Sequence, residues 1–318
     1  MLDNKKNIIF FLLFFLVIGL FAIRVFIFSV PKDFPTNSLF RVDKGQHLKE
    51  IANMLEKDGL IKNGNSFAIL AKMLGREKEM KFGVYSFERP ISVWDIIDRI
   101  TGGYFGVRPV RVTIPEGATV NKISKIISGS LNSFDVAVFK KITEGKEGYL
   151  FPDTYFFLPN AMAEDIFRVM ENNFNEKIKD LDPEISESGY SKEDIIIMAS
   201  IIEREVSNSD DKKVVSSVLW NRINIGMPLQ VDASFAYLLG KGSSELSLDD
   251  LKFESPYNTY TNKGLPPGPI SNPGLDSIKA AIHPADTDYL YFLSDQYGKT
   301  HFSETFEEHK VNKKKYLR

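Results

Sequence analysis

Two glutamates, Glu203 and Glu205, stand near the end of an apolar segment that runs from Ser191 to Val206. At about 100° per residue, they fall on opposite edges of an apolar helical face, about 80° and about 280° from Ile195. A carboxyl group in a buried helix is costly to ionise and has a raised pKa unless it is paired, as a general acid requires. The alternative is that both are ordinary solvated or salt-bridged glutamates. The periodicity does not separate Glu203 from Glu205.

The elements around these glutamates form a predicted pair of antiparallel helices. Ser191 with Asp194 three residues later is a capping box that begins the first helix. The second helix holds an apolar face after the loop at residues 207–211 and ends at Gly226, which suits a C′ position. We therefore expect a buried hairpin of helices with both glutamates at the end of its first arm.

Polar and aromatic residues after this hairpin could bind a carbohydrate. Gln230 and Asp232 lie in a short extended piece before another helix, which Asp232 or Ser234 could equally cap. A long loop at residues 255–274 carries Asn258 and Tyr260, and long loops inside a compact domain are often functional. The aromatic segment at residues 147–159 reads either as core or as a sugar-stacking surface built on Tyr149 or Tyr155.

Composition excludes several kinds of chemistry. The chain has 318 residues, a net charge of −2 and no cysteine, so disulfides, thiolate metal sites and a cysteine nucleophile are excluded. The charge gives no electrostatic case for nucleic acid. The four histidines have no metal-ligand spacing, and the motifs of serine hydrolases, zinc proteases and nucleotide-binding proteins are missing. Acid–base chemistry by carboxyl groups, without a metal or cofactor, remains.

The N-terminus predicts a membrane anchor. Residues 7–23 carry no charge and the apolar run continues to residue 30, which is long enough to span a bilayer. Lys5 and Lys6 precede it, so the positive-inside rule places residues 1–6 in the cytoplasm and the rest of the chain outside. A cleaved signal peptide is the alternative, but no small-residue cleavage site follows the run.

The remainder divides into two predicted α+β domains. Residues 31–103 read as a strand, two helices, a returning strand and a third helix, with Ser66 capping the second helix. The pattern from Val42 to Leu55 resembles a glycan-binding LysM module, although generic strand–turn–helix sequences produce it too. The glycine pair at 102–103 marks the boundary with a larger mixed domain, residues 104–318, whose buried helix carries Glu203. There we expect Thr119 and Ser133 to cap two further helices.

Five segments resemble the MltG (YceG-like) family of membrane-anchored endolytic murein transglycosylases. They are EGYLFPDTY, MASIIEREV, VLWNRINIGMPLQVDAS, SPYNTYTNKGLPPGPISNPG and IKAAIHPADTDYLYF, and they follow the family's order over residues 40–310. The resemblance implies an enzyme that cleaves the MurNAc-β-1,4-GlcNAc bond within nascent peptidoglycan strands and leaves 1,6-anhydro-MurNAc ends. It further implies work beside peptidoglycan synthases, with Glu203 as the catalytic residue. VDAS stands where the family commonly has QTDPT, which leaves roles after Asp232 open.

One carboxyl group suffices for this reaction. A glycosidase uses two, about 5 Å apart for retention or about 6.5–9.5 Å apart for inversion. Here the C6 hydroxyl of the substrate attacks, and Glu203 first donates a proton and then removes one. Gln230, Asp232, Asn258 and Tyr260 are candidates to orient the glycan, with a structural role in the loop equally open for each. The alternatives are a non-catalytic glycan-binding scaffold and a hydrolytic muramidase, which would need a second carboxyl near Glu203; Glu205 is turned about 200° away from it.

Overall fold

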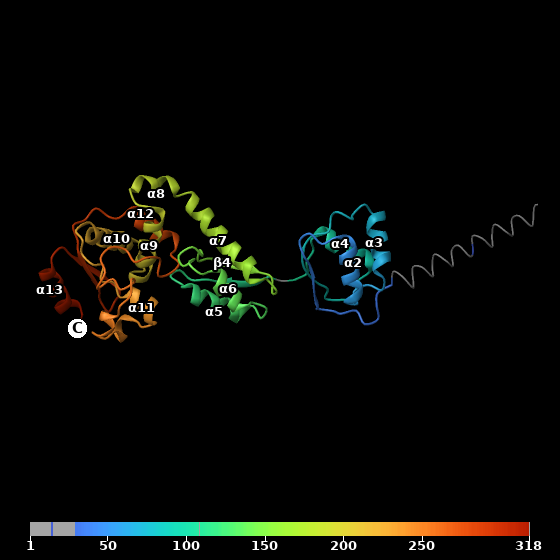
Figure 1. Cartoon of the computed structure of the whole chain (residues 1–318), viewed down its shortest axis with the longest axis horizontal. Coiled ribbons are helices and arrows are strands. Elements are labelled where there is room, and N and C mark those ends of the chain that lie inside the picture. Colours follow the sequence, from blue (N-terminus) through green and yellow to red (C-terminus); the bar gives the residue numbers. More distant parts are fainter. Residues whose placement is uncertain (1–13, 15–28, 108, 318) are drawn as a thin grey trace, which may run out of the picture. The chain divides into compact units, whose positions relative to one another are not determined.

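The computed structural model describes residues 14, 29–107 and 109–317 (Figure 1). Within these residues no helix is both long enough and apolar enough to cross a membrane. The predicted cytoplasmic segment 1–6 lies outside the described residues, as does the predicted anchor over residues 7–30 except for residues 14, 29 and 30. The chain forms two compact units, Met1–Pro109 and Val110–Arg318. Both combine helices with two-stranded sheets, so the predicted α+β class is confirmed.

The first unit has the predicted order of strand, two helices, strand and helix. Its two strands pair antiparallel, with Leu39 opposite Ser86, and the helices cover a core that includes the fully buried Phe40, Phe67 and Tyr85. The second helix is capped by Asn63, whose side chain accepts from the N–H of Ser66, so the predicted cap at Ser66 is wrong. The elements are β1 (Leu39–Val42), α2 (Leu48–Lys57), α3 (Gly64–Met73), β2 (Gly83–Ser86) and α4 (Val93–Gly102).

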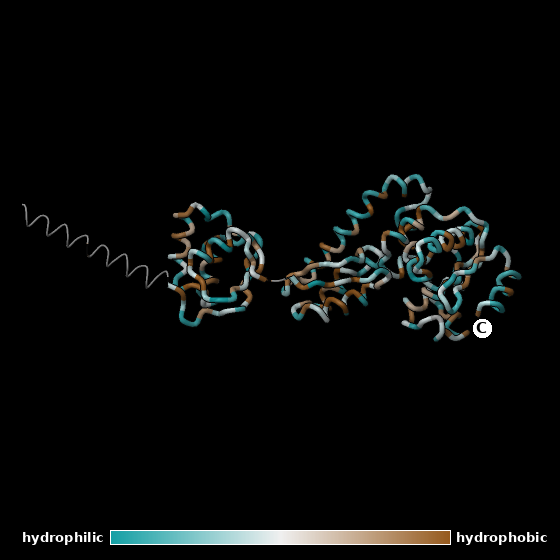
Figure 2. Tube along the Cα trace, turned by 180° about the vertical axis from the view of Figure 1, so that it is seen from behind, coloured by the Kyte–Doolittle hydropathy of each residue, from teal (hydrophilic) through white to brown (hydrophobic). Residues whose placement is uncertain are grey.

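The second unit begins with a small sheet and three helices around it. The aromatic segment forms one strand of the sheet and pairs antiparallel with the other, Val112 opposite Tyr155. Thr119 caps the first helix as predicted, whereas Asp135, not Ser133, caps the second because its carboxylate reaches the N–H groups of Ala137 and Val138. Hydrophobic and hydrophilic residues alternate along the long third helix (Figure 2). The elements are β3 (Val110–Thr113), α5 (Val120–Ser130), α6 (Val136–Ile142), β4 (Thr154–Phe157) and α7 (Ala163–Lys179).

A cluster of helices follows and holds the largest core of the unit. Its centre is α9, in which all eight residues from Ile195 to Ile202 are buried. Both α10 and α12 pack against α9 (Figure 1), and Trp220 of α10 stacks on Tyr190. The elements are α8 (Asp182–Ser188), α9 (Lys192–Glu205), α10 (Ser209–Asn224), α11 (Ala233–Leu239), the short 3-10 helices at Ser243–Glu245 and Asp250–Lys252, and α12 (Leu275–Ile282).

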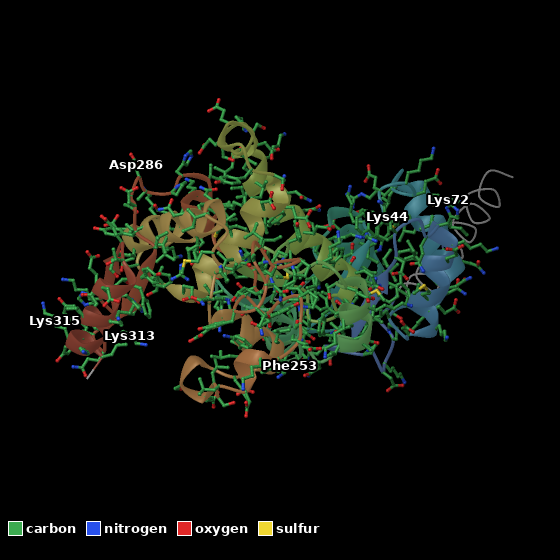
Figure 3. All side chains as sticks on the ribbon, turned by 60° about the vertical axis from the view of Figure 1, so that its left-hand side comes forward. Lys44, Lys72, Phe253, Asp286, Lys313 and Lys315 are labelled. Atoms are coloured by element: carbon green, nitrogen blue, oxygen red, sulfur yellow. The ribbon has the colours of Figure 1, made fainter. Side chains whose placement is uncertain are left out.

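A hairpin and a charged helix close the chain. The strands β5 (Tyr291–Ser294) and β6 (Thr300–Ser303) pair antiparallel, and α13 (Phe306–Tyr316) packs against both. The basic residues near the C-terminus belong to this helix, and Lys313 and Lys315 point outward from it (Figure 3). None of the residues of α13 is buried.

Candidate active site

The last turn of α9 carries both glutamates, as predicted. The helix starts at the capping box of Ser191 and Asp194, where the serine side chain accepts from the N–H of Asp194 and the aspartate accepts from the N–H of Ser191. It ends because the backbone of Val206 is extended. The buried helix therefore fixes Glu203 and Glu205 on different sides of one helix end.

Glu203 is almost completely enclosed, with 8% of its side chain exposed. Its Oε2 atom accepts from the backbone N–H of Gly274 at 3.0 Å and from the hydroxyl of Ser277 at 2.7 Å. The ammonium group of Lys212, in the first turn of α10, lies 3.3 Å from Oε1 and 3.4 Å from Oε2. The start of α12 and the start of α10 thus close around the glutamate, and Oε1 is its less occupied oxygen.

The expectation of an unpaired carboxyl group at Glu203 is wrong. All three partners of Glu203 are hydrogen-bond donors, and an ionised carboxylate is the form that only accepts. Lys212 was missed in the sequence because its charge reads as one more solvated lysine at the start of a helix. Its side chain is only 3% exposed, so its positive charge is buried with Glu203.

Two further carboxyl groups lie at this site and were also missed. Asp276 Oδ2 is 3.7 Å from the Lys212 ammonium. The Glu116 carboxylate packs against the backbone of Gly274, where any side chain would collide with it, and the adjacent Gly117 lies against Glu203. Burial raises the pKa of Glu116, the Glu203 carboxylate and Asp276 raise it further, and Lys212 lowers it. The only signal for Glu116 in the sequence is its place in the Pro-Glu-Gly turn.

Glu116 differs from Glu203 in being open to solvent. Glu116 is exposed and Asp276 has 45% of its side chain exposed. Glu203 and Asp276 thus contact one buried ammonium group, and the exposed Glu116 lies near enough for its pKa to respond to all three charges. Such a cluster can hold an extra proton, because neighbouring carboxylates repel one another when all are ionised.

Asp232 and Tyr260 lie together, but beside Glu205 and not among the hydrogen-bond partners of Glu203. The Tyr260 hydroxyl donates to Asp232 Oδ1 at 2.6 Å, and burial together with this bond raises the pKa of Tyr260. Burial raises the pKa of Glu205 to about 7; Asp232 raises it too, while the Ala233 N–H and Arg222 lower it. Glu205 thus has the raised pKa that the sequence argument required of the acid. Asp232 precedes α11 but its side chain makes no cap.

Gln230 and Asn258 are placed differently from each other. Gln230 is exposed, with φ of 51° in the left-handed region, and its N–H donates to the Thr259 carbonyl. Asn258 is fully buried; its amide nitrogen donates to the carbonyls of Leu251 and Phe253 and its oxygen accepts from the N–H of Tyr260. Of the two roles left open for Asn258, these contacts support the structural one.

The two tyrosines of the aromatic segment differ in burial and in surroundings. Tyr155 is 6% exposed and its hydroxyl donates to the Phe151 carbonyl at 2.6 Å, so it belongs to the core. Tyr149 is half-buried and lines a cavity. Among the described residues, no group of three or more His, Asp or Glu side chains is arranged to hold a metal ion.

Comparisons with known proteins agree on one family. Residues 40–315 match the YceG-like family. The chain is 33% identical to an endolytic murein transglycosylase of Bacillus subtilis strain 168 over 91% of this chain and 87% of that protein. It is 28% identical to an endolytic murein transglycosylase of Streptococcus pneumoniae strain D39, over 85% of this chain and 57% of that protein.

The fold is similar to that of a solved relative. The crystal structure of a putative YceG-like protein from Listeria monocytogenes matches with a TM-score of 0.59 and 31% identity, over 87% of this chain and 99% of that one. The matched residues include both glutamates of α9, the start of α10 and the start of α12. The chain belongs to the YceG-like family, whose relatives include endolytic murein transglycosylases.

Proposed function

We propose that this protein is an endolytic murein transglycosylase that cleaves the MurNAc-β-1,4-GlcNAc bond of peptidoglycan and leaves 1,6-anhydro-MurNAc ends. The observation that carries the proposal is the 33% identity to the Bacillus subtilis enzyme over nearly the whole of both chains. The enclosed carboxyl group at the end of α9 supports it, because this chemistry needs one well-positioned acid–base group.

Glu203 is the proposed catalytic residue. Its carboxylic acid form donates a proton to the leaving GlcNAc oxygen as the bond from that oxygen to C1 breaks. The C6 hydroxyl oxygen of MurNAc then attacks C1, and its proton returns to the Glu203 carboxylate. The two transfers balance, and the attacking hydroxyl is already tethered to the reacting sugar.

The contacts of Glu203 set a requirement for this cycle. Glu203 must carry one proton at the first cleavage, although three hydrogen-bond donors, Lys212 among them, surround its carboxyl group. Glu116 is the neighbouring carboxyl group whose pKa is raised and whose surface is exposed. We therefore assign Glu116 the role of holding the proton that first passes to Glu203, and each turnover then returns a proton to Glu203 from the C6 hydroxyl.

A hydrolytic muramidase is the second candidate, because Glu116 and Asp276 supply the further carboxyl groups such an enzyme needs. A non-catalytic glycan-binding scaffold is the third. Incubation of the full chain with uncrosslinked glycan strands, followed by mass spectrometry, separates them. Anhydro-MurNAc ends support the transglycosylase, reducing MurNAc ends support the muramidase, and uncut strands support the scaffold.

We propose further that residues 7–30 anchor the chain in the cytoplasmic membrane, with the N-terminus in the cytoplasm and the rest outside beside peptidoglycan synthases. The apolar run and the lysines before it support this arrangement. Protease added to intact spheroplasts would degrade residues 31–318 if the arrangement is correct. Full protection in spheroplasts, with degradation after lysis, would contradict it.

A further inference from the structure

A cavity of about 480 Å³ lies in the second unit away from the contacts of Glu203. Its lining includes Tyr149, Tyr237 and Tyr257, together with the carboxyl groups of Glu147 and Glu193. The volume falls in the range of small-molecule sites, about 300–1,000 Å³. The residues come from four separate segments: the start of the aromatic segment, the first turn of α9, the middle of α11 and the loop after it.

The tyrosine hydroxyls of this cavity are available to a ligand. Among the described residues none of the three has a hydrogen-bond partner, although each ring is half-buried and packs on the main core. By contrast, the hydroxyls of Tyr85, Tyr155 and Tyr260 all donate to protein oxygens. The hydroxyl oxygens of these three tyrosines are not among the buried atoms of the described residues that lack a partner, so they are open to the cavity, and a ligand there could bond them without breaking a protein hydrogen bond.

The walls of the cavity are held in place. Glu147 accepts from the N–H of Val120 at the start of α5 and from the amide of Asn272, which fixes the floor. The Tyr237 and Tyr257 rings lie 5.3 Å apart, centroid to centroid. Gly268 lies against the Tyr257 hydroxyl, and a Cβ there would come within 2.9 Å of it. These contacts define a preformed site.

The chemistry of the lining selects a neutral sugar. Aromatic faces pack on the C–H face of a pyranose ring, while hydroxyl and carboxylate oxygens take and give the hydrogen bonds of its hydroxyl and amide groups. The two carboxyl groups outnumber Lys140, the lysine of the lining, so an anionic ligand is disfavoured. Burial raises the pKa of Glu147 to about 7, which lets this group donate as well as accept near neutral pH.

The Glu193 edge of the cavity is the part that lies far from the proposed point of cleavage, whereas its floor is nearer, because Glu147 there accepts from the amide of Asn272, two residues before Gly274, which bonds Glu203. Glu193 at its edge and Glu203 lie ten residues apart on α9, about 15 Å along the helix at 1.5 Å per residue. We propose that this tyrosine cavity is a distal subsite for a neutral N-acetylated pyranose of the glycan strand. The proposal rests on the proposed function for the identity of the strand. A glycan strand that reaches both Glu203 and this cavity must continue past the cleaved bond on both sides, or extend far from it on one side. Such a strand suits cleavage within the chain rather than at its end.

Removal of two hydroxyls tests the subsite. The experiment uses the full chain with Glu203→Gln, which prevents turnover. Chitohexaose is titrated by calorimetry into this protein and into a variant that also carries both Tyr237→Phe and Tyr257→Phe. The rings remain and no protein hydrogen bond is lost, so the fold is expected to persist. We expect the dissociation constant to rise at least about tenfold. Tyr297→Phe, a change at an exposed hairpin residue, is the matched control and should leave the dissociation constant unchanged.

The outcomes of this binding experiment are distinct from those that test the proposed transglycosylase activity. Equal affinity of the double variant and the control, or no binding of chitohexaose by either, would overturn the subsite. Neither result bears on whether active protein forms anhydro ends. With active protein, the double variant should lose rate on long strands and retain the rate on the shortest cleavable ones, because remote contacts support cleavage only when the strand reaches them.

Discussion

The Nζ atom of Lys212 lies 3.3 Å from Oε1 of Glu203, and their side chains are 3% and 8% exposed. A buried ion pair is costly to break, because removal of one partner leaves the other charge uncompensated. The pair also bears on how the proposed acid works, because the proton that Glu203 donates has to sit on a carboxyl group that faces this lysine.

Lys212→Met should destabilise the second unit by about 3–5 kcal/mol, because it leaves the buried carboxylate of Glu203 without its cation. Urea unfolding at pH 7 measures the loss. Glu203→Gln combined with Lys212→Met should recover more than half of it, because both charges are then gone. An equal loss in the single and the double variant would show that the pair is not the source.

Glu116→Gln should lower the rate of glycan cleavage at pH 7 at least about tenfold. The raised pKa of Glu116 lets it retain a proton at higher pH than an ordinary glutamate, so its loss should move the alkaline limb of the pH–rate profile to lower pH. The fold-loss should therefore shrink as the pH is lowered. Glu187→Gln, a change of an exposed glutamate in α8, is the control. A profile that falls uniformly without moving would contradict the role of proton holder.

Glu205 should make the second unit less stable as the pH rises. Its pKa in the folded chain is about 7 and its ordinary value is 4.5, so between these values the folded state binds more protons than the unfolded state. Its contribution to the free energy of unfolding is full below about pH 4.5 and is lost as the pH rises to about 7. Glu147 acts in the same direction.

Glu205→Gln should therefore flatten the pH dependence of stability between pH 4.5 and 7. Urea unfolding at several pH values, with wild type alongside, provides the comparison. Glu187→Gln should leave the slope of the wild type unchanged. An unchanged slope in the Glu205 variant would mean that Glu205 titrates normally in the folded chain.

Much of the local structure was predictable because the signals are themselves local. The capping box of Ser191 with Asp194 begins α9, and Thr119 begins α5, as the sequence indicates. The caps of α3 and α6 were misplaced by a few residues. There Asn63 and Asp135, not the later serines, bring a side-chain oxygen within reach of the free N–H groups.

The site was predictable only for the residues that α9 carries itself. Lys212, Ser277 and Glu116 reach Glu203 from three other elements, and their approach depends on how α10, α12 and the turn before α5 pack on α9. No periodicity encodes that packing. Asp232 and Tyr260, predicted as candidates to orient the glycan, lie together beside Glu205 and not among the hydrogen-bond partners of Glu203.

The central claim is that Glu203, and not Glu205, transfers the proton. The most direct measurement is mass spectrometry of the products that wild type, Glu203→Gln and Glu205→Gln release from uncrosslinked glycan strands, after circular dichroism has verified folding. We predict that Glu203→Gln lowers anhydro-MurNAc ends at least about 100-fold while Glu205→Gln keeps most of the activity. Anhydro ends at the wild-type rate from Glu203→Gln would contradict the account.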